Sequence, residues 1–270
     1  MARKSKSSQW RRFFRQTGRA TASAGRFVAK HVAAGYQKID PDVPRHIIQM
    51  PLLSYTFLSL GNDKIRPGKP DGYPPLIFVH GLGGGRGDFL LMANFLWFKG
   101  RKRSYRIKFQ KGQSIEQMAA SLARFIRDVK KSTKESKVEV VAHSLGGLVA
   151  RCAVVEHGLQ SSVKTLITMG APHHGTHPAR YIHTKVIRDI RPNSPLLQKL
   201  NRKRWPKAVR GVTFWSRNDL FILPPESATM KGMEPVDATP FTHYSYLIDP
   251  RSWRNVAQVL MPLKPLTPSV

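Results

Sequence analysis

The stretch "VEVVAHSLGGLVARCAVVEHG", residues 138–158, decides the fold of this chain. A valine-rich run, residues 138–141, leads directly into "AHSLGG". Apolar residues then recur at helical spacing: Leu148, Val149, Cys152 and Val155. This change of period predicts a buried strand, a sharp turn and a helix, with Ser144 at the apex of the turn.

A serine at this apex has a physical reason. The turn from a buried parallel strand into its helix forces the apical residue into strained backbone dihedrals and lifts its hydroxyl clear of the sheet. Only small residues fit two positions before and two after it, and the chain has Ala142 and Gly146 there. The usual pattern is G-x-S-x-G, so we treat Ala142 as a variant of it that is larger by one methyl group. The N-terminal N–H groups of the helix would point to where an oxyanion forms.

A second stretch, "PPLIFVHGLGGGRGDF" over residues 74–89, combines a buried-strand run with a glycine-rich loop. We predict that the backbone N–H of Leu82 and that of Leu145 form an oxyanion hole, and that His80 orders the loop between them. The alternative is a phosphate-binding loop. The stretch lacks the G-x-G-x-x-G phasing, the Walker lysine and serine and the distant acidic residue of such loops, which argues against that interpretation.

Three motifs in this order carry a resemblance to a known family: "FVHGLGG" from residue 78, "VVAHSLGGLVAR" from residue 140 and "ITMGAPHHGT" from residue 167. Over roughly residues 75–260 the chain resembles the lipase and esterase branch of the α/β-hydrolases, of the bacterial triacylglycerol lipase type. The resemblance implies an α/β fold with a doubly wound, mostly parallel sheet, helices on both faces and a small cap insertion. It also implies a catalytic triad in the chain order Ser, Asp, His, and no cofactor.

The acid and the base of this triad follow from that order. Asp219 comes shortly after a predicted strand over residues 209–215, where the family places its acid. The competing carboxylates are Asp189, Glu226 and Asp237. His243 is the only histidine after Asp219, so the order Ser, Asp, His makes His243 the base. His143, beside the nucleophile, is expected to pack beneath the turn.

The histidines after the third motif, His173, His174, His177 and His183, suggest a metal site at first sight. No carboxylate or cysteine lies near enough to complete a zinc set, so we predict no bound metal. Residues 176–206 contain prolines and helical pieces but no strand, which predicts a cap that could act as a lid over the acyl pocket. The single cysteine, Cys152, is expected to be a core residue on the helix after Ser144.

Other segments have clear helix or strand patterns but contain no candidate catalytic residue. Phe89–Phe98 and Ser114–Lys130 predict helices, the second with Ser114 as N-cap and Gln117 as its capping-box partner. Tyr105–Phe109 and the alternating run over residues 52–60 predict strands. A last helix is expected over Pro250–Leu260, after the loop that carries His243.

Length and net charge limit the number of domains and the kinds of partner that the chain can have. The 270 residues, 41% of them hydrophobic, fit one hydrolase domain over residues 39–270, and the net charge of +29 predicts attraction to a polyanionic surface. Residues 1–38 hold ten lysines or arginines and no acid, with aromatic and apolar residues at helical spacing. They predict a basic amphipathic helix. It either lies on anionic lipid or docks its apolar face onto the hydrolase body.

Two further clusters add to the basic character: Lys99, Arg101, Lys102, Arg103, Arg106, Lys108 and Lys111, then Lys199, Arg202, Lys203, Arg204, Lys207 and Arg210. Each is either a solvated face or part of an anionic-membrane footprint. With no clear signal peptide and no apolar run long enough to span a bilayer, we expect a cytoplasmic or peripheral membrane protein.

The sequence therefore predicts a serine hydrolase that cleaves carboxylic esters, most readily those of lipids, and binds no specific nucleic acid. Two alternatives stay open. The same triad supports acyl transfer or amide cleavage. The charge could instead be the function, on a hydrolase scaffold whose catalysis is vestigial.

Overall fold

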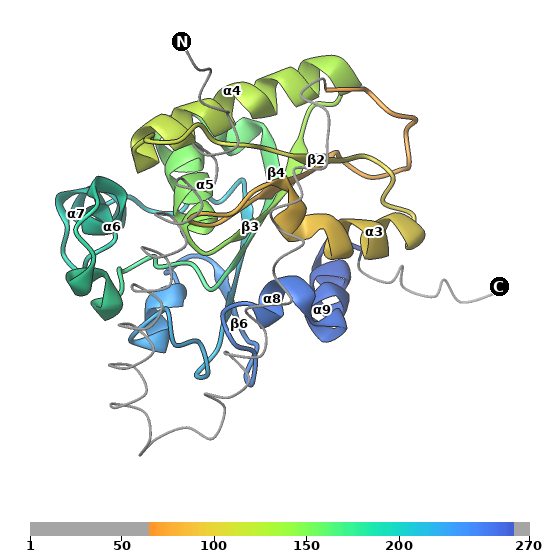
Figure 1. The fold of residues 1–270 in the computed structure, drawn as a ribbon. Coiled ribbons are helices and arrows are strands. Elements are labelled where there is room, and N and C mark those ends of the chain that lie inside the picture. Colours follow the sequence, from red (N-terminus) through yellow and green to blue (C-terminus); the bar gives the residue numbers. More distant parts are fainter. Residues whose placement is uncertain (1–64, 262–270) are drawn as a thin grey trace, which may run out of the picture. The chain divides into compact units, whose positions relative to one another are not determined.

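The structure, a computed structural model, describes residues 65–261 (Figure 1). Its strands are β1 (Leu76–Val79), β2 (Ser104–Arg106), β3 (Val138–His143), β4 (Val163–Met169), β5 (Arg210–Trp215) and β6 (Glu234–Asp237). Its α-helices are α3 (Leu90–Phe98), α4 (Ile115–Thr133), α5 (Leu145–Glu156), α6 (Lys185–Asp189), α7 (Pro195–Asn201), α8 (Ser245–Ile248) and α9 (Pro250–Leu260). Short 3₁₀ helices are η2 (Arg86–Phe89), η3 (Leu159–Ser161), η4 (His177–Tyr181) and η5 (Pro225–Ala228).

The described strands form one sheet in the order β2-β1-β3-β4-β5-β6, and every neighbouring pair is parallel. The strand order reverses between β1 and β3, because β2 lies on the far side of β1 while β4 follows on the far side of β3. In open α/β sheets, ligands bind outside the carboxyl ends of the strands at such a switch point. Here those ends carry His80, after β1, and Ser144, after β3.

Helices cover both faces of the sheet (Figure 1). Alternate strand residues point to opposite faces, so Ile77 and Val79 pack with α4 and α5, whereas Leu76 and Phe78 pack with α3, α8 and α9. Near-continuous apolar strands are typical of parallel sheets that are buried on both sides. The predicted α/β fold is therefore confirmed.

Most predicted elements are found close to their expected bounds. The predicted cap of α4 is present: Ser114 Oγ accepts the N–H of Gln117 at 3.2 Å, and Gln117 Oε1 accepts the N–H of Ser114 at 2.8 Å. The helix predicted over Phe89–Phe98 divides into η2 and α3, and α9 spans the predicted residues. The strand predicted over Tyr105–Phe109 is shorter and begins one residue earlier, as β2.

Two members of the first basic cluster, Arg101 and Arg103, do not lie on the solvated face that its composition predicts. Arg101 is fully buried and its guanidinium lies 2.7 Å from a carboxylate oxygen of Glu139, which is also buried. Arg103 is buried as well and pairs with Glu135 at 2.7 Å. The reason is that β3 carries an acid, Glu139, inside the sheet, and a buried carboxylate needs a counter-charge. An anionic-surface footprint that includes these two arginines is therefore wrong.

The segment predicted to form a cap, residues 176–206, contains η4, α6 and α7 and no strand. The buried Arg151 of α5 ties it to the body, since its guanidinium donates to the carbonyls of Leu200 at 2.8 Å and His173 at 3.1 Å. The predicted helix over residues 1–38 and strand over residues 52–60 lie outside the described residues. Within residues 65–261, no helix combines the length and the apolar character needed to cross a membrane.

Candidate active site

Ser144 occupies the turn between β3 and α5, with φ +53° and ψ −128°. A positive φ is unfavourable for a residue with a side chain, so the surrounding packing must hold it there. A Cβ at Gly146 would collide with the backbone carbonyls of Val79 and His80, which makes glycine obligatory at that position. Ala142 packs its methyl group into the core beside α5, so its departure from the usual glycine is accommodated.

His243 and Asp219 reach Ser144 from two other loops. His243 Nε2 lies 2.9 Å from Ser144 Oγ, and His243 Nδ1 lies 2.9 Å and 3.0 Å from the two carboxylate oxygens of Asp219. Because an ionised carboxylate can only accept, Nδ1–H donates to Asp219, and this leaves Nε2 free to accept the Ser144 hydroxyl proton. The structure thus brings the three predicted residues together in one hydrogen-bonded chain.

The competing carboxylates lie elsewhere. Asp237, at the end of β6, accepts the backbone N–H of Thr239 at 2.8 Å. Glu226 belongs to η5 and Asp189 to α6, and in the part of the chain that the structure describes the carboxylate that hydrogen-bonds His243 is that of Asp219.

Asp219 is held in a rigid position. It is 1% exposed, and its Oδ1 accepts the backbone N–H groups of Phe221 at 3.0 Å and Ile222 at 3.2 Å. The Phe221 ring lies against the imidazole of His243, with 4.9 Å between ring centroids. The loop therefore orients the acid with its own backbone and the base with a neighbouring ring.

His143 supports the base from below, in the buried position that the sequence predicts. Its Nε2 lies 2.8 Å from the backbone carbonyl oxygen of His243. Burial lowers the pKa of His143 well below its ordinary value, so the ring is neutral and Nε2–H donates to that carbonyl. This hydrogen bond fixes the backbone of the loop on which the base is mounted.

Gly170, which the sequence interpretation missed, leaves the room that the acid and base need. It follows β4 with φ +55°, and a Cβ there would lie 2.7 Å from Asp219 Oδ2 and 3.3 Å from His243 Nδ1. Any larger residue would push the carboxylate and the imidazole apart. The only sequence signal was its place at the end of a buried strand in "ITMGAPHHGT".

The glycine loop, residues 81–85, lies against the nucleophile. A Cβ at Gly81 would be 3.0 Å from the Cβ of Ser144, so the loop backbone passes directly beside the serine. The His80 ring bonds the Gly81 carbonyl through Nδ1 at 2.9 Å, which orders the loop as predicted. Leu145 is the first residue of α5, and the first N–H groups of a helix have no partner within it.

Asp88 holds the other end of this loop. Its Oδ1 accepts the N–H of Gly85 at 3.0 Å, and burial raises the pKa of its carboxyl to about 6. Nothing in the sequence pattern had singled out this residue.

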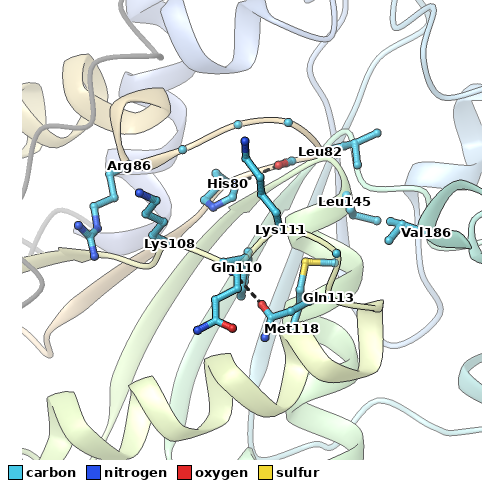
Figure 2. A pocket seen from close by; sticks show the side chains of 16 residues that line it. His80, Leu82, Arg86, Lys108, Gln110, Lys111, Gln113, Met118, Leu145 and Val186 are labelled. Atoms are coloured by element: carbon cyan, nitrogen blue, oxygen red, sulfur yellow. Dashed lines mark hydrogen bonds between the residues drawn. The ribbon is translucent and has the colours of Figure 1, made fainter. Parts of the chain in front are cut away.

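A cavity of about 510 Å³ adjoins the loop (Figure 2). Its lining combines the glycine loop, residues 108–113 and apolar side chains of three helices, Met118, Leu145 and Val186. Val186 belongs to α6, so the segment that the sequence predicts to be a cap borders the cavity. Leu82 and Leu145, whose N–H groups are the predicted oxyanion donors, both line it.

The described residues offer no metal site. No group of three or more histidine, cysteine, aspartate or glutamate side chains converges among them. His173 is buried and hydrogen-bonded to Thr168 Oγ1 at 3.0 Å, so it is structural. Cys152 is buried in α5, and burial raises its thiol pKa to about 11, as befits a core residue.

The parallel sheet with helices on both faces and Ser144 at the turn after β3 is the α/β-hydrolase fold, which the similar solved structures share. Residues 70–189 match the family described as PGAP1-like alpha/beta domain. A lipase of Bacillus licheniformis in its mature form is similar with a TM-score of 0.59 and 19% identity, over 73% of this chain and 95% of that one. Lipase B of Aspergillus fumigatus is similar with a TM-score of 0.60 and 17% identity, over 74% of this chain and 54% of that one.

Proposed function

We propose that this chain is a serine hydrolase that cleaves carboxylic esters through an acyl-enzyme. The observation that carries the proposal is the chain of hydrogen bonds from Ser144 Oγ through His243 to the buried Asp219, with Ser144 held at a positive φ. Hydrogen-bonded nucleophile, base and orienting acid are the signature of an activated hydroxyl.

The chemistry follows from that geometry. His243 Nε2 accepts the Ser144 hydroxyl proton as Oγ attacks the ester carbonyl, and Asp219 stabilises the imidazolium that forms. The N–H groups of Leu82 and Leu145 hold the oxyanion, and one such donor is worth about 3 kcal/mol in related enzymes. His243 then protonates the leaving alcohol. Water, activated by the same histidine, releases the acid from Ser144.

A lipid ester is the substrate class that we favour. Apolar side chains of Met118, Leu145 and Val186 line the cavity beside the glycine loop and suit an acyl chain. Two similar solved proteins carry the name lipase. In this proposal the cap segment acts as a lid, since Val186 borders the cavity.

Association with an anionic lipid surface is a second role, supported by one exposed patch. Trp97 and Phe98, at the end of α3, are 46% and 80% exposed, and Lys102 Nζ lies 3.5 Å from the centre of the Trp97 ring. Exposed aromatic residues flanked by lysines are typical of segments that lie at a membrane interface. Peripheral attachment through this patch and residues 1–38 would deliver the site to its ester.

Hydrolysis of p-nitrophenyl esters from acetate to palmitate tests the proposal on wild type and Ser144→Ala, with and without anionic vesicles. The substitution is expected to lower kcat about 10⁶-fold, because the reacting atom is removed. Higher kcat/KM on longer chains and on vesicles would support a lipase at a charged interface. Short-chain activity indifferent to vesicles would contradict the second role and leave a simple esterase.

The rival functions predict a different result. A wild type that hydrolyses none of these esters faster than Ser144→Ala would contradict ester hydrolysis. Acyl transfer, amide cleavage or a vestigial, surface-binding hydrolase scaffold would then account for the geometry of the site better than the proposal does.

A further inference from the structure

The cavity beside the glycine loop has a cationic wall that ester hydrolysis alone does not use. Three of its lining residues are basic: Arg86, Lys108 and Lys111. None of the described residues that line it is acidic. The described lining therefore supplies no carboxylate to Lys108 and Lys111, and a low-dielectric wall on the opposite side would strengthen the field of these two lysines.

The two lysines belong to the loop that follows β2. Figure 2 shows both side chains extending from residues 108–111 toward the glycine loop. Within residues 65–261, neither ammonium group has a carboxylate partner within 4.0 Å, in contrast to Lys199 and Lys203, which pair with Glu156. Lys108 and Lys111 thus keep their donors available to a ligand.

Arg86 stands at the edge of the same wall. Its Nε donates to the carbonyl of Arg106 at 3.2 Å, so the guanidinium is tethered between the glycine loop and β2. Arg86 adds positive charge to the cavity, and the ammonium groups of the two lysines are the hydrogen-bond donors that can adjust to a ligand.

A buried polar atom on the cavity lining also lacks a partner. His80 is 8% exposed, and its Nε2 has no hydrogen-bond partner among the described residues, whereas Nδ1–H donates to the Gly81 carbonyl. A buried polar atom left unpaired is costly unless a water or ligand reaches it. With Nδ1 protonated, Nε2 can accept from a hydroxyl group or a water that accompanies the ligand.

We propose that this cavity is a subsite for an anionic group of the ester substrate, a carboxylate or a phosphate, held by Lys108 and Lys111. The apolar part of the substrate lies on Leu145 and Val186, next to the predicted oxyanion donors. The inference rests on the proposed function and narrows its substrate class to amphiphilic, negatively charged esters. Charge-assisted hydrogen bonds from two lysines are strong enough to dominate selectivity.

A matched pair of substrates tests this subsite: p-nitrophenyl hexanoate and the p-nitrophenyl monoester of adipate, which differ by a terminal carboxylate. Wild type is expected to favour the adipate ester in kcat/KM by about tenfold or more. In the Lys108→Met/Lys111→Met double variant, the adipate-to-hexanoate ratio is expected to fall by about tenfold. A purely structural role for the lysines would lower both values together and leave the ratio unchanged.

Lys131→Met/Lys207→Met is the control, because both lysines are exposed away from the cavity and the change in net charge is the same. The adipate-to-hexanoate ratio of this control variant is expected to equal that of wild type. An unchanged ratio in the cavity variant overturns the inference. So does an equal fall in the control, which would mean that net charge alone steers the substrate.

Calorimetry separates this inference from the proposed function, because it needs no turnover. Hexyl phosphate is expected to bind wild type and to bind the cavity double variant about tenfold more weakly. Inorganic phosphate is expected to bind more weakly than hexyl phosphate, and equal affinities would show a free-anion site instead. If hexyl phosphate binds but no ester is hydrolysed, the anionic subsite stands and the proposed hydrolase function is rejected. If esters are hydrolysed but hexyl phosphate does not bind, the hydrolase function stands and the subsite is rejected.

Discussion

Replacing Asp219 with asparagine is expected to lower kcat/KM for an ester about 10⁴-fold while leaving the fold intact. The asparagine side chain is nearly the same shape, and its oxygen can still accept the N–H groups of Phe221 and Ile222, which now bond Asp219 Oδ1. It carries no charge to stabilise the imidazolium. Its NH₂ group would also favour the wrong tautomer of His243, with Nε2 protonated and unable to accept the Ser144 proton.

We would measure kcat/KM for an ester with Asp219→Asn and with Asp237→Asn. Thermal unfolding of both variants checks that they are folded. Asp237 is the matched control, because it is the last residue of the neighbouring strand, β6, and hydrogen-bonds Thr239 instead of His243. Activity of Asp237→Asn is expected to stay near that of wild type. A larger loss of activity in Asp237→Asn than in Asp219→Asn would show that Asp219 is not the acid of the triad.

Replacing Arg101 with methionine is expected to lower the free energy of unfolding by about 3–5 kcal/mol. The methionine would leave Glu139 charged and buried in β3, where its partner guanidinium now lies 2.7 Å away. The same change removes the hydrogen bond from Arg101 to the Pro74 carbonyl, at 2.9 Å.

Denaturant unfolding of three variants checks this prediction. Arg251→Met removes the half-exposed pair with Asp249 and is expected to cost less than about 1 kcal/mol. Arg101→Met/Glu139→Gln removes the orphaned charge and is expected to recover part of the loss. An Arg101→Met variant as stable as Arg251→Met would show that the buried pair contributes no more than a surface pair.

The sequence pattern sufficed for residues whose role depends on local structure. Ser144 lies in a turn that strand and helix periodicity locate. Asp219 follows a predicted strand, and His243 precedes a predicted helix. The chain order that links them came from resemblance to a family, and the structure places the three side chains in contact.

The sequence pattern failed where a role depends on contacts between distant segments. Gly170 matters because its missing Cβ leaves space for Asp219 and His243, which lie far along the chain. Arg101 looked like one more member of a basic run, but Glu139, 38 residues away, draws it into the core. Composition predicts the charge of a segment, and only the tertiary structure decides which charges are buried.

Covalent labelling tests the central claim most directly. Wild type treated with a fluorophosphonate and digested for mass spectrometry is expected to carry one adduct, on the peptide that contains Ser144, because the hydroxyl is activated by His243. Ser144→Ala and His243→Ala are expected to remain unlabelled, with unchanged thermal unfolding. Labelling on another serine, or equal labelling of Ser144 in His243→Ala, would contradict the account of this site as a nucleophile activated by its histidine.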